Sequence, residues 1–353
     1  MIQKDLSFLD ETIANEAAQF KPYTPDTSLW PLYDKWLLAS CLQKAIRRGH
    51  SEIAQIAALY LYQLDKQMLQ RRILVTAYED IGIGDTFALK LTTRICTAIQ
   101  TRKTIGKVKA YMFTADILAK STKCRAADHI YMISNNVEEG QEIREAINEL
   151  TTKDKLRCIL DDTASIYVRA YAAQKLHQTS KCDAIYLMEQ SGVEPCLIDT
   201  CCVAASKMRD PLAVYMPLFI KEYPEHKVQH FDVPAEHLND LPFYAFDPLH
   251  TRSGKLAVKR WIKSALDLQP YTAKQVGMAI FLLECALCDT ETTSDKLDAL
   301  KHKDVEASLR YSGVPLDLHD QLLNIVTNGM DALNTIRAEI RADLTQTTPR
   351  LLI

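Results

Sequence analysis

Apolar residues recur at spacings of three and four along most of this chain, which is the pattern of one buried face of an α-helix. The clearest stripe begins at Leu32 and predicts a helix with Arg47 in its last turn, where a cation suits the helix dipole. Gly49 can take the left-handed conformation that closes such a helix, and Ser51 is suited to cap the next one, over 52–64. Long periodic runs of this kind predict an all-α fold.

The stretch AYEDIGIGDT, residues 77–86, places Glu79 and Asp80 at the end of a helix that begins near residue 65. Gly82 stands where the C-terminal cap of that helix belongs, and Asp85 stands where the N-cap of the next helix belongs. Carboxylates at a helix C-terminus are unfavourable by up to about 1 kcal/mol each, because they face the negative end of the dipole.

That cost indicates that Glu79 and Asp80 have a role in the molecule. We expect them mainly to bond a neighbouring cation, such as Arg71 or Arg72. A contact with a partner protein is the alternative. A metal site is disfavoured because no His or further carboxylate follows at a ligand spacing.

The helical pattern continues over about 86–100, 107–121 and 124–135, and then gives way to an acidic, polar stretch over 137–155. We interpret this change as a domain boundary. The expected organisation is an N-terminal helix and linker over 1–30, a helical domain over 31–137 and a second helical region over 138–353.

The second region stays helical, but its units are shorter. Consecutive hairpins, including a unit over 180–192, resemble HEAT-like stacking without a clean repeat period. Residues 224–255 are irregular and rich in Pro and His, so we expect a long surface connection, and such loops often carry function. Three further helices close the chain, and we expect the tail over 346–353 to be frayed.

Composition is that of an ordinary globular protein. The 353 residues are 47% apolar and 25% charged, and only 10 are Gly, which favours helices over a turn-rich β architecture. The net charge of −3 gives no global argument for nucleic acid, although a local basic face is compatible with it. Ten Cys accompany no visible secretory signal, and no window approaches 18 uninterrupted apolar residues. We therefore expect a reducing, cytoplasmic location and no membrane span.

Three pieces of the first region carry a resemblance to a known family. They are LQKAIRRGHSEIAQIAALYLYQL (42–64), RRILVTAYEDIGIGDTFALKL (71–91) and AYMFTADILAKSTKCRAADHIY (110–131). Together, residues 32–135 resemble the C-terminal region of the replication-associated recombination AAA+ ATPases, the bacterial RarA/MgsA group with its eukaryotic Werner-helicase-interacting relatives. The Arg-Arg…Glu-Asp-Ile-Gly stretch is the specific part. The family-like residues are Arg71, Arg72, Glu79, Asp80, Gly82 and Lys120.

The resemblance implies a helical oligomerisation module that forms tetramers. It belongs to proteins that act at stalled replication forks and bind single-stranded-DNA-binding protein and DNA ends. The ATPase module of that family precedes this region, whereas about 30 residues precede it here and no Walker A pattern occurs. We therefore expect a relative without a motor that forms a dimer or tetramer. Its candidate partners are DNA, single-stranded-DNA-binding protein and a separate AAA+ ATPase.

A second stretch, FDPLHTRSGKLAVKRWIKSA (246–265), predicts a basic helix. Its lysines recur every four residues and so share one face, near Trp261, which is a suitable contact for nucleic acid or phosphate. A Thr cap with backbone N–H groups at the helix start can also hold an anion. The candidate binding residues are His250, Arg252, Lys255, Lys259, Arg260 and Lys263. The alternatives are a solvated basic face with Trp261 in the core, and a catalytic His250.

Motifs of hydrolytic or redox chemistry are absent from the sequence. It contains no His-Glu-x-x-His and no Gly-x-Ser-x-Gly pattern. The Cys285 and Cys288 pair lies in an apolar helix without a second pair, so we interpret it as buried core rather than as a metal or redox site. We name no catalytic residue, metal ligand or cofactor.

The preferred function is a non-catalytic adaptor or regulator associated with DNA replication, recombination or repair, acting through oligomerisation and protein or DNA binding. One alternative is an enzyme with its site in the irregular 224–255 segment around His250. The other is a purely structural helical scaffold.

Overall fold

The structure, a computed structural model, is built almost entirely of α-helices, which confirms the all-α prediction. It describes residues 6–25, 30, 33–136, 138–180, 192–208 and 210–347. The helical unit expected over 180–192 and the tail expected over 346–353 lie mostly outside the described residues. Within the described chain, none of the helices combines the length and the apolar character that a membrane span requires.

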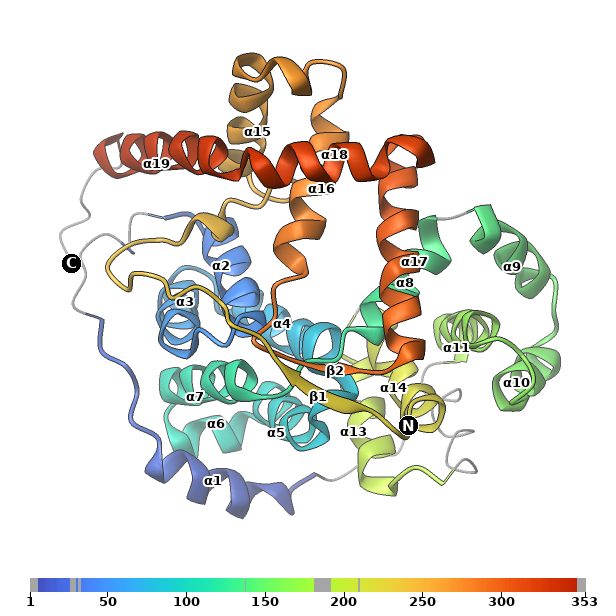
Figure 1. Cartoon of the computed structure of the whole chain (residues 1–353). Helices are drawn as coiled ribbons and strands as arrows, with labels where there is room; N and C mark the ends of the chain where they lie inside the picture. Colours follow the sequence, from blue (N-terminus) through green and yellow to red (C-terminus); the bar gives the residue numbers. More distant parts are fainter. Residues whose placement is uncertain are drawn as a thin grey trace.

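The helices before residue 137 include the block that resembles the RarA/MgsA group. They are α1 (Leu9–Gln19), α2 (Lys35–Arg47), α3 (Ser51–Leu64), α4 (Lys66–Thr76), α5 (Thr86–Thr97), α6 (Ile99–Ile105), α7 (Lys107–Lys120) and α8 (Ala126–Asn136). In this block α2 packs against α3, and α3 packs against α7 (Figure 1).

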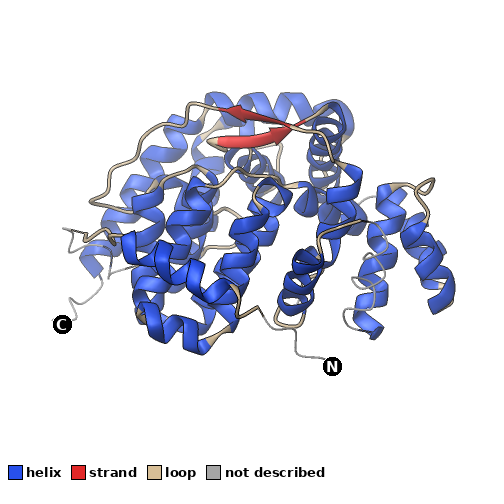
Figure 2. Ribbon diagram, turned by 90° about the horizontal axis from the view of Figure 1, so that it is seen from below, coloured by secondary structure: helices blue, strands red, loops and turns tan. Residues whose placement is uncertain are grey.

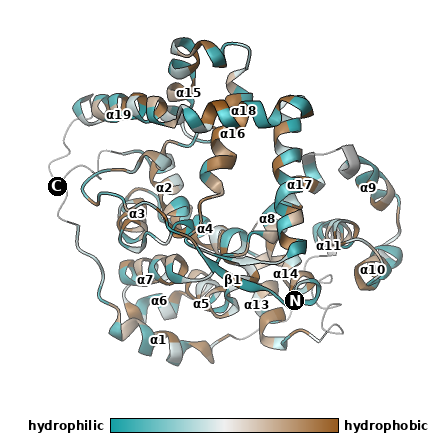
Figure 3. Cartoon of the chain, in the orientation of Figure 1, coloured by the Kyte–Doolittle hydropathy of each residue, from teal (hydrophilic) through white to brown (hydrophobic). Residues whose placement is uncertain are grey.

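The later helices are shorter on average in the middle of the chain and longer toward its end. They are α9 (Glu138–Asn148), α10 (Thr152–Leu160), α11 (Ile166–Ser180), α13 (Pro195–Ala205), α14 (Leu212–Glu222), α15 (Arg252–Ser264), α16 (Ala273–Cys285), α17 (Asp295–Ser312), α18 (His319–Asn328) and α19 (Met330–Thr347). Most helices carry both teal and brown residues in Figure 3, as expected of amphipathic helices with one buried face.

A single hydrophobic cluster runs through both halves of the described chain, from Trp30 to Ile340. Two contacts connect the earlier helices with the later part of the chain. α8 packs against α17, and α2 packs against the short 3-10 turn Phe243–Ala245. A smaller cluster seats α1 on α5 and α7 through side chains such as Ile13 and Phe113. The two predicted regions therefore share their main core.

Local signals set the ends of the first helices. Asp34 caps α2, since its carboxylate accepts a hydrogen bond from the backbone N–H of Trp36 at 2.7 Å. Gly49 has φ +71°, which confirms its predicted left-handed conformation. The prediction for Ser51 is wrong: His50 precedes α3, Ser51 is already helical, and its hydroxyl bonds Asp116 of α7 instead of the backbone.

The AYEDIGIGDT stretch forms a π-helical turn over Ala77–Ile81 at the end of α4. Gly82 follows it with φ +50°, and the Asp85 carboxylate caps α5, so both predicted caps are confirmed. A Cβ at Gly84 would lie 2.5 Å from the carbonyl oxygen of Thr122, so this turn lies directly against the chain after α7. Single π turns of this kind are rare and are often found at functional sites.

The described residues contain one small sheet, which no sequence pattern predicted. It pairs β1 (Lys227–His230) with β2 (Thr290–Thr293) in antiparallel register. The strands lie along one edge of the helical body (Figure 2). Lys123 adds a parallel bridge to Glu291, which brings the chain after α7 into contact with β2. The rest of the irregular segment is exposed or half-buried up to Asp240 and mostly buried from Leu241 to Asp247.

Candidate functional site

A cavity of about 520 Å³ lies between α2, α4, α8, α16, α17 and the loop over 247–250. Its walls include Arg72 and Glu79 of the family-like motif, and also His250 from the irregular segment. The structure therefore brings together residues that the sequence presented as two separate features. A cavity of this size is within the usual range for sites that bind small molecules.

Asp80 anchors one wall of this cavity and is fully buried. Its carboxylate accepts a hydrogen bond from Arg47 Nε at 2.8 Å and lies 2.7 Å from Arg47 Nη2 and 3.2 Å from Arg125 Nε. One side chain of the π-helical turn thus holds α2 and α8 in place. Removing one partner from such a buried ion pair is strongly destabilising, because it leaves an uncompensated charge.

The expected partners of Glu79 and Asp80 were wrong. Arg71 is exposed, and Arg72 donates to the amide oxygen of Gln43 at 3.4 Å. The π-helical turn directs the two carboxylates toward α2 and α8, so their partners come from other helices and not from the preceding turn of α4.

Glu79 is the side chain of this group whose protonation state stands out. Its carboxyl lies 2.6 Å from the Gln43 amide nitrogen and 3.6 Å from Arg47 Nη2. Burial, together with the negative charges of Asp128 and Asp80, raises the pKa of Glu79 to about 8. At neutral pH Glu79 is therefore mostly a neutral carboxylic acid inside the cavity.

The cavity lining also includes Asp128, His129 and Asp304, which no motif of the sequence marks. His129 Nδ1 lies 2.7 Å from Asp304 Oδ2, and the Ser308 hydroxyl donates to Asp304 Oδ1 at 3.0 Å. Asp128 forms an ion pair with Arg125, and burial raises the pKa of its carboxyl. These three side chains offer ligand atoms within 4.8 Å of one another, which is a geometry that could hold a metal ion.

No local signal could have revealed this cluster. Asp128 and His129 are adjacent on an apolar helix, but Asp304 is contributed by α17, 175 positions after His129. Each member of the cluster already has a protein partner, so hydrogen bonds and ion pairs account for its arrangement in this structure.

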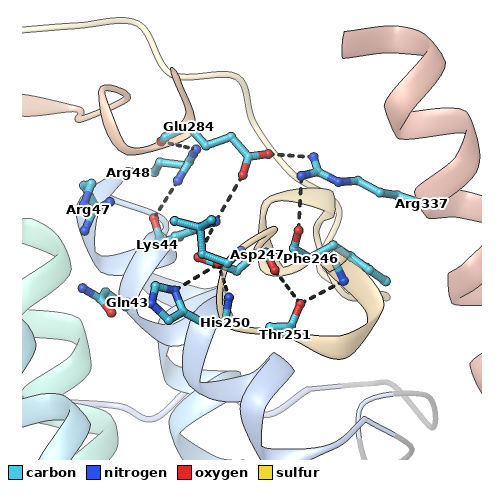
Figure 4. A network of polar contacts seen from close by, with 12 residues as sticks. Gln43, Lys44, Arg47, Arg48, Phe246, Asp247, His250, Thr251, Glu284 and Arg337 are labelled. Carbon is cyan, nitrogen blue, oxygen red and sulfur yellow. Dashed lines mark hydrogen bonds and ion pairs between the residues drawn. The ribbon is translucent and has the colours of Figure 1, made fainter. Parts of the chain in front are cut away.

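A second polar network reaches the cavity through Lys44 and Asp247 and is drawn in Figure 4. Lys44 Nζ is 3.3 Å from Asp247 and 3.1 Å from Glu284, and Arg337 is 2.6 Å from Glu284. Burial opposes ionisation of Glu284, but Arg337 and Lys44 outweigh it and hold the pKa of this carboxyl below its usual range. Arg48 donates to the backbone carbonyl of Glu284 at 2.7 Å, so the network ties α2 to α16 and α19.

His250 lies at the mouth of the cavity with its side chain 69% exposed. Its Nδ1 is 3.0 Å from the Asp247 carboxylate, which also accepts hydrogen bonds from the backbone of Leu249 and His250. Burial would raise the pKa of Asp247, but Lys44 and His250 hold it well below the ordinary value. The pair is an accessible imidazole oriented by a buried carboxylate, an arrangement that general bases also use.

The basic helix, α15, stands at the upper edge of Figure 1, and its predicted cations face solvent. Thr251 caps it by accepting a hydrogen bond from the Gly254 N–H at 3.0 Å. Trp261 is buried against Gly329, so it is a core residue and not part of the basic face. The exposed cations are Arg252, Lys255, Lys259, Arg260 and Lys263. We call this set the α15 basic face.

The start of α15 is closed by its own preceding loop. A Cβ at Gly254 would lie 2.0 Å from the carbonyl oxygen of Asp247, and the Thr251 hydroxyl donates to that same oxygen at 2.8 Å. Backbone of this chain thus covers the first turn. The exposed charges lie along the side of the helix.

Two predicted residues lie away from both features. Lys120 forms an ion pair with Asp116 at 2.8 Å and lines a separate, open groove between α1, α3 and α7. Gly82 shapes the π-helical turn through its backbone, which passes against Cys124. Cys285 and Cys288 are buried free thiols, as predicted for core residues.

Comparisons with known proteins give no relative for this chain. A scan against protein-family models finds no match, and neither the curated proteins nor the solved structures contain a match. The resemblance of residues 32–135 to the RarA/MgsA group therefore stays a prediction from the sequence.

Proposed function

We propose that this protein is a non-catalytic adaptor or regulator in DNA replication, recombination or repair, which binds DNA through the α15 basic face and self-associates. The observation that carries the proposal is the exposure of five cations along one helix. Only Arg260 among them has a carboxylate of the described chain within ion-pair distance, Asp343 at 3.8 Å. Their charges are therefore available to a polyanion.

The spacing of these cations fits a phosphate backbone better than a base-reading site. Arg252, Lys259 and Lys263 fall within a narrow stripe, because seven residues nearly complete two helical turns, and four residues make slightly more than one turn and rise by about 6 Å. Trp261 is buried, so it is not available as a platform on which a base could stack. We therefore expect binding that depends on salt and only weakly on sequence.

Self-association is supported by the resemblance and by exposed apolar residues of the first region. Leu64 and Ile99 are each more than half exposed, and Leu64 is next to the ion pair that Lys35 and Asp65 form at 2.9 Å. Exposed apolar groups of this kind suit a protein contact. The resemblance adds single-stranded-DNA-binding protein and a separate AAA+ ATPase as candidate partners, in the cytoplasm.

The DNA proposal is tested by fluorescence anisotropy with labelled single- and double-stranded DNA between about 50 and 200 mM salt. Changing Lys255, Lys259 and Lys263 to Gln should lower the slope of log K against log salt by about 2 to 3. The matched control changes three lysines of another helix pair, Lys103, Lys107 and Lys109, to Gln, which alters the net charge equally. An equal loss in both variants would attribute binding to net charge and contradict the proposal.

Self-association is tested by light scattering after size exclusion. Leu64→Lys should shift the protein toward the monomer, because a charge in an apolar contact has no partner. Leu316→Lys is the control, since Leu316 is equally exposed but lies near the end of the chain. A wild-type protein that is monomeric at high concentration would refute self-association.

An enzyme with its site around His250 is the second candidate, favoured by the Asp247–His250 pair at the mouth of the cavity. The accessible imidazole of His250 and the neutral Glu79 line the same cavity, so it holds a potential base and a potential acid. Loss of a small-molecule turnover on His250→Ala, with DNA binding retained, would favour this candidate over the adaptor.

A further inference from the structure

Two buried polar atoms of α2 have no partner within the described chain, and both side chains line the central cavity. They are Arg47 Nη1 and Ser40 Oγ. Arg47 is 1% exposed, and its other two nitrogens are directed at Asp80. Buried polar groups without a partner are rare in folded proteins, so two of them in one cavity wall point to a ligand.

These atoms belong to a local group that is rich in cations. Gln43 links it, since its amide nitrogen contacts Glu79 at 2.6 Å and its amide oxygen accepts from Arg72 at 3.4 Å. Arg72 is half-buried, and its hydrogen-bond partner among the described residues is this neutral amide. We call Gln43, Arg47, Arg72 and Glu79 the arginine corner.

The charge of the arginine corner depends on Glu79. With the pKa of Glu79 near 8, the corner holds two guanidinium groups and a neutral acid at pH 7, and Asp80 compensates only one of them. The remaining ionisable groups around the cavity are Lys44, Arg125, Lys301, His129, His250, Asp128, Asp210, Asp247 and Asp304. Most of these are already engaged in ion pairs or hydrogen bonds with one another or with neighbouring residues.

The lining of the cavity changes from aromatic to charged along α2. Trp36, Ser40, Gln43 and Arg47 line it at helical spacing, from the aromatic mouth to the charged interior. Ser40 and Arg47 are separated by a rise of about 10 Å along α2. Phe281 and Tyr311 add aromatic surface on the opposite side.

We propose that this cavity binds a small organic anion, a carboxylate or a phosphate monoester that carries a planar ring. The anionic group accepts hydrogen bonds from Arg47 and Arg72, and the ring lies toward Trp36 and Phe281. Arginine forks suit both acid groups, because their N–H donors match paired acceptor oxygens. The site is separate from the α15 basic face, so it goes beyond the proposed function.

A divalent cation fits the cluster of Asp128, His129 and Asp304 less well. It would have to displace Arg125 from Asp128 and break the His129–Asp304 hydrogen bond, since all three potential ligands are engaged. Arg47 Nη1 can only donate, and the Ser40 hydroxyl can donate as well as accept, so this wall suits an anion or a carbonyl better than a metal. A metal is therefore the competing outcome of the test.

The experiment is a titration of the full chain with benzoate and with phenyl phosphate, followed by calorimetry and by tryptophan fluorescence. Trp36 is the reporter, because Trp30 and Trp261 are buried. Benzamide is the neutral probe with the same ring. We expect saturable, millimolar binding of at least one anion, and binding of benzamide at least about ten-fold weaker. The stronger of the two anions identifies the acid group that the cavity prefers.

Arg72→Gln should weaken binding of the preferred anion about ten-fold or more, because it removes charge-assisted hydrogen bonds. Arg71→Gln is the matched control, since Arg71 is the adjacent residue but is exposed and outside the cavity. Its affinity should equal that of the wild type, and thermal melts establish that both variants fold.

Three results would overturn the proposal. The first is equal affinity for benzoate and benzamide in the wild type, which needs no variant. The second is an equal effect of Arg71→Gln and Arg72→Gln. The third is no saturable anion binding while Mn²⁺ binds and is lost on Asp304→Asn, which would assign the cavity to a metal instead.

Discussion

The same types of side chain occupy opposite environments in the two charged regions of this molecule. Lys44 lies between two carboxylates and is buried, whereas Lys259 of the α15 basic face points into solvent with no ion pair to a described residue. Buried charges fix which helices meet, since each needs its partner, and exposed charges contribute little to stability. The buried charges around Lys44 hold helices together, and the α15 basic face is free to contact a partner.

The largest expected effect comes from the centre of the buried region. Asp80→Asn should lower the free energy of unfolding by about 3 to 5 kcal/mol, because Arg47 and Arg125 then share no charged partner. Urea denaturation measures this value. Asp343→Asn, at the exposed ion pair of α15, should change it by less than about 1 kcal/mol. An equal loss of unfolding free energy in the two variants would show that buried and exposed ion pairs contribute equally to the stability of this protein.

The next largest effect on stability is expected where α15 packs against the loop at Asp247. Gly254→Ala should destabilise the protein by about 1 to 3 kcal/mol, because the added Cβ would meet the Asp247 carbonyl oxygen. Gly277→Ala in α16 is the control, since its Cβ would make ordinary contacts, 3.4 Å or longer, and Ala is the better helix former. Thermal unfolding of the two variants should separate them, and a Gly254→Ala protein as stable as the wild type would contradict the close packing.

A pH dependence is expected only from the buried region. The folded pKa of Glu79, about 8, exceeds its ordinary value of 4.5, so the folded protein binds more protons between these pH values. The stabilising contribution of the neutral acid is full below about pH 4.5 and is lost as the pH rises through about 8. Glu79→Gln cannot ionise, so its stability relative to the wild type should increase from about pH 5 to about pH 9.

Urea unfolding at several pH values measures this difference. The pKa of Asp128 is also raised, so its ionisation also destabilises the folded protein as the pH rises. Some dependence of the unfolding free energy on pH should therefore remain in the Glu79→Gln variant. A stability difference that does not vary with pH would show that Glu79 has an ordinary pKa in the folded protein.

The smallest effect is expected on the α15 basic face. Lys259→Gln should change the free energy of unfolding by less than about 0.5 kcal/mol, because an exposed lysine without an ion pair leaves nothing unsatisfied. Chemical denaturation beside the DNA titration checks it. A loss above about 2 kcal/mol would mean that this face is structural, and would weaken the DNA proposal.

The sequence was sufficient wherever the signal was local. Gly49, Asp85 and Thr251 close or open their helices as predicted, because a cap needs only the residue and its next few neighbours. The exposed face of α15 also followed from spacing alone. Ser51 was misassigned because its hydroxyl had a distant competitor, Asp116, for the hydrogen bond that a cap would use.

The candidate site was predictable only in part. The position of Glu79 and Asp80 at a helix end indicated an unusual role, but their partners lie on other helices, 33 positions away in the case of Arg47 and Asp80. His129 and Asp304 meet across 175 positions, and β1 pairs with a strand about 60 positions later. Such pairs depend on the packing of the whole chain, which periodicity and spacing do not encode.

The second network has a consequence for how the protein is made. Lys44 and Arg48 leave the ribosome early, but Glu284 and Arg337, which complete their environment, are translated more than 230 positions later. Until then the emerging chain carries cations at positions that are buried in the finished molecule. A fragment that stops at residue 137 would keep those cations without their carboxylates, so the N-terminal block depends on the far end of the polypeptide to complete its folding.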